Sequence, residues 1–138
     1  KAILEGEPIE VYNKGKMKRD FTYIDDIIEG LLTVLYSPPK AVDYRNDQIS
    51  DPSSSKAPFK IYNIGNNSPV DLMDFIVAIE TKLRKKAIIN FKPLQPGDVV
   101  ASNADVENLV EDFGYQPSTT VNEGIHEFIE WYKSFYHI

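Results

Sequence analysis

The sequence predicts a soluble domain of the α/β or α+β class, because short β-like runs alternate with amphipathic helical stretches along its length. Its 138 residues are 42% apolar and 26% charged, the composition of an ordinary globular chain. A chain of this size buries about two-thirds of its unfolded surface, so we expect one domain over residues 1–138. The sequence has no cysteine, which excludes disulfides, cysteine-ligated zinc and a thiol nucleophile.

Charge and hydropathy restrict the partners. Lys and Arg number 15 against 21 Asp and Glu, and the net charge of −6 disfavours non-specific nucleic-acid binding. No apolar run approaches the roughly 20 residues that a membrane helix needs. The start lacks the basic-then-apolar layout of a signal peptide. We therefore expect a cytoplasmic protein without nucleic-acid or membrane partners.

The first residues are predicted to form a helix end and two short strands. Residues 1–6, followed by Pro8, have the pattern of the last turn and C-cap of a helix, whose beginning we expect to lie upstream of the sequence. Residues 9–12 alternate apolar and polar side chains like a strand, and residues 13–16 have turn composition. A second β-like run covers residues 21–24.

A helix and a long loop follow. Apolar residues recur at helical spacing over residues 24–35, and the aspartates at 25 and 26 stand where a helix N-terminus favours negative charge. The prolines at 38 and 39 end this helix. Residues 41–58 are rich in Asp, Ser and Pro and lack periodicity, which predicts a mobile loop.

The next segment is predicted as strand, helix and strand. Residues 59–64 are rich in aromatic and β-branched side chains, typical of a strand. Residues 68–71 supply a capping serine, a proline at the first helical position and an acid at the third, which predicts a helix start. Residues 87–91 form the next strand, and a proline-rich loop covers residues 93–98. The apolar stripe of the helix comprises Leu72, Phe75, Ile76, Ile79 and Leu83.

Two helices complete the chain. Asp105 is placed to cap a short helix over residues 106–113, and Gly114 is its expected C-terminal stop. Residues 120–123 form a capping box that opens the last helix. One face of that helix carries Ile125, Phe128, Ile129, Tyr132 and Tyr136.

The familiar catalytic and nucleotide motifs are missing. No spacing of the seven glycines matches the G-x-G-x-x-G fingerprint or a P-loop, so we expect no dinucleotide or triphosphate cradle within this chain. Tyr12 and Lys16 have the spacing of a catalytic tyrosine and lysine, but the turn between them opposes the helical geometry that acid-base chemistry needs. Tyr36 and Lys40 have the same spacing, and the prolines between them exclude a helix. We expect no catalytic residue here.

The two histidines indicate no metal site. His126 and His137 are eleven residues apart, with no carboxylate or second histidine at ligand spacing. We expect both on the surface.

Three features are candidates for ligand binding. Residues 14–19 place four cations in an acidic chain, which is either a solvated turn or an anion site, since the planar fork of Arg19 matches phosphate geometry. Asp98 lies on a stiff loop and is either an acceptor for sugar or ribose hydroxyls or an ordinary turn residue. Asn63 lies in an otherwise apolar stretch, where it could brace a loop or contact a ligand.

Three motifs carry a family resemblance. RDFTYIDD (residues 19–26), YNIG (62–65) and QPGD (95–98) match, in order and spacing, the extended short-chain dehydrogenase/reductase family of nucleotide-sugar epimerases and dehydratases. The finer details of the sequence look most like the UDP-glucuronate 4-epimerase branch. The resemblance covers essentially the whole chain and implies the C-terminal, substrate-binding part of such an enzyme, without its N-terminal Rossmann core.

The resemblance also implies roles for individual residues. Arg19 matches the arginine that contacts the pyrophosphate of a UDP-sugar, and Gln95 and Asp98 match the loop that reaches the nucleotide end. Val11 and Asn13 belong to the segment that lies along the uracil through backbone groups. NAD and the catalytic tyrosine and lysine would belong to the remainder of the full-length enzyme, which would be a partner of this part. NAD would take the hydride from C4 of the sugar and return it to the other face.

Two other functions fit the same residues. The chain could be part of a nucleotide-sugar dehydratase or decarboxylase, which shares the fold but not the reaction. It could also be a non-catalytic interaction domain whose basic turn binds an acidic partner. That last hypothesis leaves the three spaced motifs unexplained.

Overall fold

The computed structural model describes residues 1–40, 52–55 and 57–138, and it contains both helices and strands, which confirms the mixed α/β class. In its first part lie the helix α1 (Ala2–Glu5), the strand β1 (Pro8–Val11), the 3-10 turn η1 (Tyr12–Gly15), the short strand β2 (Lys18–Arg19) and the helix α2 (Ile24–Leu35). Later come β3 (Val70–Asp71), α3 (Leu72–Leu83), β4 (Ile88–Phe91), α4 (Glu107–Phe113) and α5 (Val121–Tyr136).

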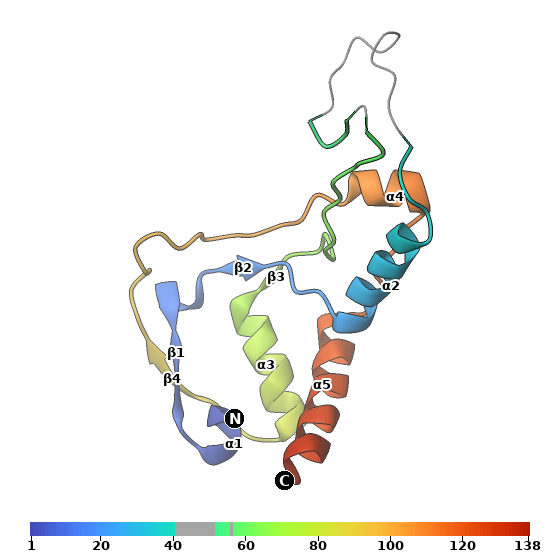
Figure 1. The fold of residues 1–138 in the computed structure, drawn as a ribbon. Coiled ribbons are helices and arrows are strands. Elements are labelled where there is room, and N and C mark those ends of the chain that lie inside the picture. The colour runs from blue at the N-terminus through green and yellow to red at the C-terminus, as the bar shows by residue number, and fades with distance from the viewer. Residues whose placement is uncertain (41–51, 56) are drawn as a thin grey trace.

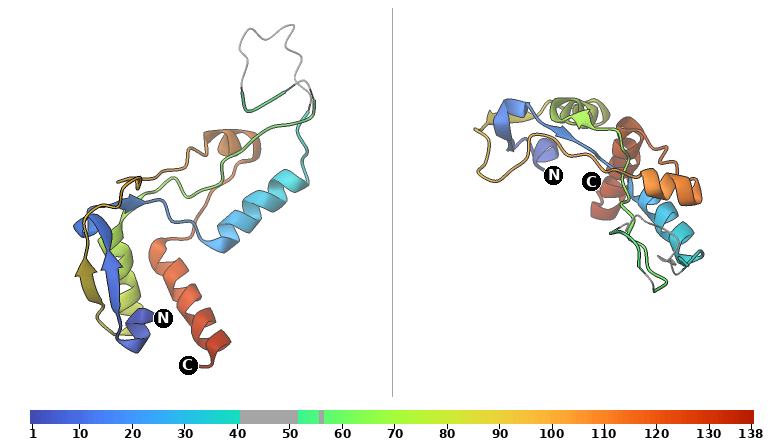
Figure 2. Two further views of the ribbon diagram at one scale, coloured as in Figure 1. Left: turned by 60° about the vertical axis from the view of Figure 1, so that its left-hand side comes forward. Right: turned by 90° about the horizontal axis from the view of Figure 1, so that it is seen from above.

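The strands form two small sheets. β1 and β4 pair in parallel, with Val11 opposite Phe91, and β2 and β3 pair antiparallel, with Arg19 opposite Val70. A parallel pair requires a long crossover, and here the crossover includes β2, α2 and α3. Figure 1 shows β1 beside β4, α3 beside α5, and α2 next to α4 at the opposite end. The turned views in Figure 2 agree with this arrangement.

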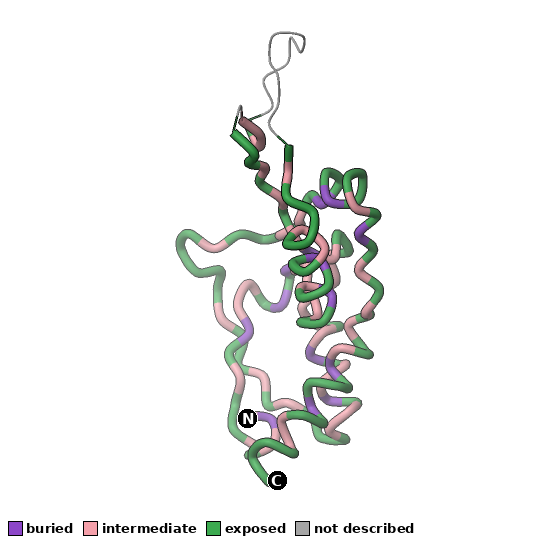
Figure 3. The backbone as a smooth tube through the Cα atoms, turned by 45° about the vertical axis from the view of Figure 1, so that its right-hand side comes forward, coloured by how far each residue is buried: buried purple, intermediate pink, exposed green. Residues whose placement is uncertain are grey.

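Buried residues lie at several separate places along the described chain rather than in one large core (Figure 3). α3 and α5 bury Ile76, Ile125 and Ile129. Leu109 of α4 is fully buried, and Tyr115 just beyond α4 is 5% exposed. Val11 and Met17 are also buried, so burial in the described part of the chain is divided among several small clusters.

Most helix boundaries agree with the sequence predictions. α1 ends at Gly6, which has the left-handed φ of 79° that favours glycine, and α4 ends in the same way at Gly114. The capping box at Thr120 and Glu123 is present in both directions. α2 spans the predicted residues 24–35.

Two predicted strands are wrong. Residues 21–23 pair with no strand of the described chain, and Ile24 already begins α2. The ring of Phe21 instead stacks on Phe75 of α3, with 3.9 Å between ring centroids. Among the described residues, 59–64 make only an isolated bridge, between Lys60 and Ser54. Aromatic and β-branched composition favours strands, but a strand also needs a partner, which composition does not supply.

The start of α3 differs from its prediction. The helix begins at Leu72 and not at Pro69, because Val70 and Asp71 pair with β2. The apolar stripe predicted for this helix does line an apolar cavity. Most of the predicted loop over residues 41–58, namely 41–51 and 56, lies outside the described residues.

Within the described residues, no helix is both long and apolar enough to span a membrane.

Candidate functional site

Arg19 and Asp98 form an ion pair that joins two of the sequence motifs. Nη2 of Arg19 donates to Oδ1 of Asp98 at 3.0 Å, across 79 residues of chain. Nη1 donates to the carbonyl oxygens of Lys18 at 2.9 Å and of Val100 at 3.3 Å. Three of the five N–H groups of the guanidinium are thus engaged by described residues. The side chain is 25% exposed, and no described residue accepts from its two remaining N–H groups.

Asp98 is held by its own turn. Gly97 has a φ of 85°, which allows the tight turn before the aspartate. The N–H of Asp98 donates to the carbonyl of Gln95 at 3.2 Å, and Oδ1 also accepts from the N–H of Val99 at 2.8 Å. No described residue donates to Oδ2, and the side chain is 31% exposed. Oδ2 is therefore available to a hydroxyl donor. The Gln95 side chain is exposed beside this turn.

β1 and η1 carry Val11 and Asn13, the remaining residues that the sequence suggested for binding a nucleotide. The Val11 side chain is 2% exposed, and its carbonyl accepts from the N–H of Lys92 at 2.9 Å. Asn13 has a left-handed φ of 49° and donates from Nδ2 to the carbonyl of Lys16 at 2.8 Å. The side chain of Asn13 thus braces the turn that leads into β2. Within the described chain β1 pairs along one edge only, which leaves backbone groups on its other edge.

Asn63 lies apart from this pair and braces a loop. Its Nδ2 donates to the carbonyl of Asp105 at 3.0 Å, just before α4. Of the two roles that the sequence left open, the structure therefore shows the bracing one. A neighbouring contact has the same effect, because Tyr62 donates to Oδ2 of Asp112 at 2.6 Å. Burial and this hydrogen bond raise the pKa of Tyr62 to about 12.

The rejected catalytic pair has no catalytic geometry. Tyr12 donates to Oε2 of Glu10 at 2.7 Å, which raises the pKa of Tyr12. The same hydrogen bond, with Lys92 as a second donor, lowers the pKa of Glu10. Tyr12 and Lys16 flank a turn whose central residues have positive φ, so no helical face carries both.

Both histidines are exposed, as predicted. Nε2 of His126 lies 3.4 Å from Nζ of Lys82. In the part of the chain that the structure describes, no group of His, Asp and Glu is arranged to hold a metal ion.

Asp20 is the residue that sequence reasoning missed. Its Oδ2 accepts from the N–H groups of Asn67 and Ala104, both at 3.0 Å, and Oδ1 accepts from Ser68 at 3.2 Å. Its position directly after Arg19 was the one sequence feature that could have drawn attention to Asp20. Its hydrogen-bond donors are backbone N–H groups, and no pattern of residue types identifies those. The carboxylate joins segments on both sides of β2.

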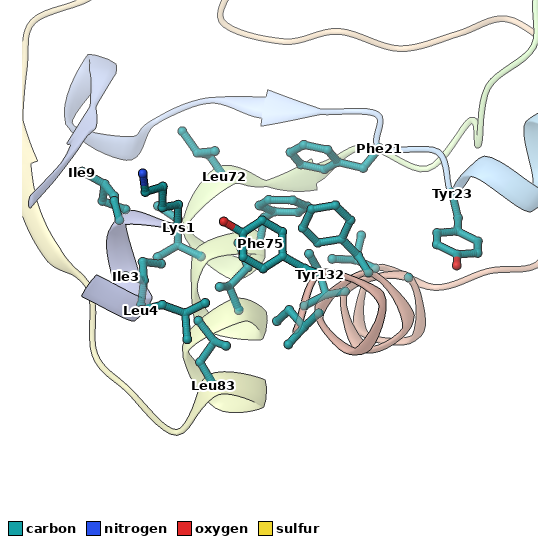
Figure 4. A pocket seen from close by; sticks show the side chains of 18 of the residues that line it. Lys1, Ile3, Leu4, Ile9, Phe21, Tyr23, Leu72, Phe75, Leu83 and Tyr132 are labelled. Atoms are coloured by element: carbon teal, nitrogen blue, oxygen red, sulfur yellow. The ribbon is translucent and has the colours of Figure 1, made fainter. Parts of the chain in front are cut away.

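A separate apolar cavity of about 620 Å³ lies between α1, β1, α3 and α5 (Figure 4). Figure 4 shows Leu4, Ile9, Leu72, Phe75 and Leu83 around it. Lys1 and Glu10 are the charged residues in its described lining. Such a surface suits apolar groups and not a diphosphate.

Comparison with known proteins shows a similarity to one family. Residues 1–65 match the model of the NAD dependent epimerase/dehydratase family. The first 65 residues of the chain are thus similar to this family. The family resemblance carried by the three motifs is thus confirmed.

The relatives are longer proteins. Protein CapI of Staphylococcus aureus is 47% identical over 136 residues, covering 99% of this chain and 41% of that protein. The probable UDP-glucuronate 4-epimerase of Rhizobium meliloti (strain 1021) is 39% identical over 136 residues, covering 98% of this chain and 40% of that enzyme. The chain thus spans about two-fifths of the length of these relatives.

A solved structure has the same fold. The UDP-glucuronic acid 4-epimerase from Bacillus cereus, in complex with UDP-glucuronic acid and NAD, superposes with a TM-score of 0.75 at 25% identity. The match covers 98% of this chain and 38% of that enzyme.

Proposed function

We propose that this chain is the C-terminal, UDP-sugar-binding part of an NAD-dependent enzyme similar to UDP-glucuronate 4-epimerase. The observation that carries the proposal is the Arg19–Asp98 pair, which places a cationic fork and a carboxylate oxygen side by side on a partly exposed surface. The likeness to the probable UDP-glucuronate 4-epimerase of Rhizobium meliloti supports the sugar nucleotide as ligand. The enzyme as a whole would interconvert C4 epimers through a 4-keto intermediate.

Each binding group has one task. The accessible N–H groups of Arg19 receive the diphosphate, because a guanidinium donates two parallel hydrogen bonds to phosphate oxygens. Oδ2 of Asp98 accepts from a ribose hydroxyl, while Oδ1 remains with Arg19. Gln95 offers its amide at the same end. Backbone groups on the open edge of β1, near Val11 and Asn13, lie along the uracil.

The residues of this chain do not fit NAD. None of the seven glycines has the fingerprint spacing, and Gly65 packs against Ala104 rather than opening toward a ligand. The remainder of the enzyme would therefore bind NAD and supply the acid-base pair. We infer that this chain alone is inactive and that the remainder packs against its exposed apolar faces.

Titration of the isotope-labelled chain with UDP and UDP-glucuronate, followed by NMR, tests the proposal. Saturable shifts are expected at the amides of Val11, Arg19 and Asp98, with dTDP as the weaker control ligand. Arg19→Lys keeps the charge but loses the planar fork, and should weaken UDP binding about tenfold, or about 1.4 kcal/mol.

Arg84→Lys is the matched control, because Arg84 is exposed at the end of α3 and should not alter UDP binding. The proposal fails if UDP causes no saturable shift. It also fails if the two lysine variants bind UDP equally well.

A further inference from the structure

The carboxylate of Asp20 accepts three backbone hydrogen bonds at the end of β2. The donors are Asn67 and Ser68 on one side and Ala104 on the other, at 3.0, 3.2 and 3.0 Å. They lie 47, 48 and 84 residues further along the chain. One side chain thus fixes two segments that are distant in sequence.

These two segments flank the strand that carries Arg19. Asn67 and Ser68 lead into β3, which pairs with β2. On the other side, the N–H of Lys18 donates to the carbonyl of Val100 at 2.9 Å, and the N–H of Ser102 donates to the carbonyl of Lys18 at 3.2 Å. The carbonyl of Val100 also accepts from Arg19. Figure 1 shows β2 beside β3 in this region.

We propose that Asp20 is the positioning residue of the Arg19–Asp98 site. The Asp20 carboxylate holds the segment around Ala104, and this fixes the chain from Asp98 to Ser102 against β2. The positions of Asp98 and of the Val100 carbonyl relative to the Arg19 guanidinium are set in this way. The expected effect of Asp20 on ligand binding rests on the proposed function. Its effect on the position of Arg19 and Asp98 does not depend on that function.

A carboxylate is needed because it offers acceptors only. Its two oxygens hold about four lone-pair sites, and three are used here. An asparagine of the same shape offers one oxygen and turns an NH₂ group toward at least one backbone N–H. Asp20→Asn therefore removes at least one of these hydrogen bonds while the volume of the side chain stays nearly the same.

The matched control is Asp26→Asn. Asp26 also accepts two backbone hydrogen bonds, from Ser118 at 3.3 Å and Thr119 at 3.2 Å, and it is buried. It joins α2 to the segment before α5, away from Arg19. Both variants lose backbone hydrogen bonds to a carboxylate, but only one loses them beside the binding site.

The first measurement is amide hydrogen exchange without ligand. Asp20→Asn should speed exchange at Lys18 and Ser102 relative to the wild type, and Asp26→Asn should not. Unchanged exchange at these amides in Asp20→Asn overturns the inference, whatever the ligand does.

The second measurement is UDP affinity by the same NMR titration. Asp20→Asn should weaken UDP binding about tenfold, whereas Asp26→Asn should stay within about twofold of the wild type. Equal losses in the two variants would overturn the positioning role, because a general loss of stability would then explain both. If the wild type itself binds no UDP while Lys18 and Ser102 respond as expected, the proposed function fails and the positioning of Arg19 by Asp20 stands.

Discussion

Gly65, in the YNIG motif, occupies a position where a larger side chain has no room. A Cβ here would overlap the Cβ of Ala104 and would lie 3.3 Å from Oδ2 of Asp20. Gly65 is not among the residues with positive φ, so packing and not backbone conformation requires glycine. Its carbonyl also accepts from the buried hydroxyl of Tyr115 at 3.3 Å. The motif that indicated the family thus has a structural role at this residue.

Gly65→Ala should lower the free energy of unfolding by about 1–3 kcal/mol, the usual cost of overpacking. Ala104→Gly, added to the same chain, removes the methyl group that the new side chain meets and should recover part of the loss. Urea unfolding of the wild type, both single variants and the double variant measures this coupling. Strictly additive effects would contradict the contact.

At the residue scale, the sequence could indicate chemistry but not partners. The cationic turn and the QPGD loop were both recognised, yet only the fold shows that Arg19 and Asp98 meet. Asn63 could not be assigned from sequence, because its partner is the backbone carbonyl of Asp105. The same reason hid Asp20, whose three donors are main-chain groups.

At the scale of elements, Glu80 joins the end of α3 to the start of β4. Its buried carboxylate accepts from Nζ of Lys86 at 2.6 Å and from the N–H of Ala87 at 2.8 Å. These donors lower the pKa of Glu80 below its ordinary value of 4.5. The folded chain therefore binds this proton less readily than the unfolded chain. The ionised form contributes stability above pH 4.5, which is lost as the pH falls through the lowered pKa.

Glu80→Gln should be less stable than the wild type at pH 7, and the difference should shrink as the pH falls from about 5 to about 3. Urea midpoints measured at steps across this interval test the expectation. Glu7→Gln, at an exposed carboxylate, controls for the change in net charge. A stability difference that stays constant down to pH 3 would rule out this role for the ionised carboxylate.

Local patterns predicted the helices well and the strands poorly. α2 and α5 follow from apolar periodicity and capping residues, which are properties of neighbouring residues. β3 has two residues and exists only because β2 lies opposite, so it displaced the predicted helix start at Pro69. Residues 59–64 have strand composition but lack a ladder partner in the described chain.

At the scale of the whole molecule, two helices present apolar side chains to solvent. On α2, Leu31 is 53% and Leu35 is 66% exposed, and on α5, Phe135 is 61% exposed. Rings on α5 also form a row, with 5.6 Å between the centroids of Phe128 and Trp131 and 5.4 Å between those of Trp131 and Phe135. Large apolar faces of this kind favour association.

The chain in isolation should therefore self-associate reversibly, and its sedimentation coefficient should rise with concentration. Leu31→Glu places a charge within the exposed face of α2 and should weaken the association. Ile88→Glu, on β4 at a comparable 55% exposure, is the control and should have a smaller effect. A sedimentation coefficient independent of concentration in the wild type would contradict this expectation.

The long separation between the paired groups also governs when the site can form. Arg19 meets Asp98 across 79 residues, and Asp20 meets Ala104 across 84. During synthesis the basic turn leaves the ribosome well before either partner exists. Closing such loops carries an entropy cost that is recovered only when the distant segment arrives, so we expect this region to fold slowly and late. The Arg19–Asp98 pair is thus formed by two distant segments and not by any local segment of the chain.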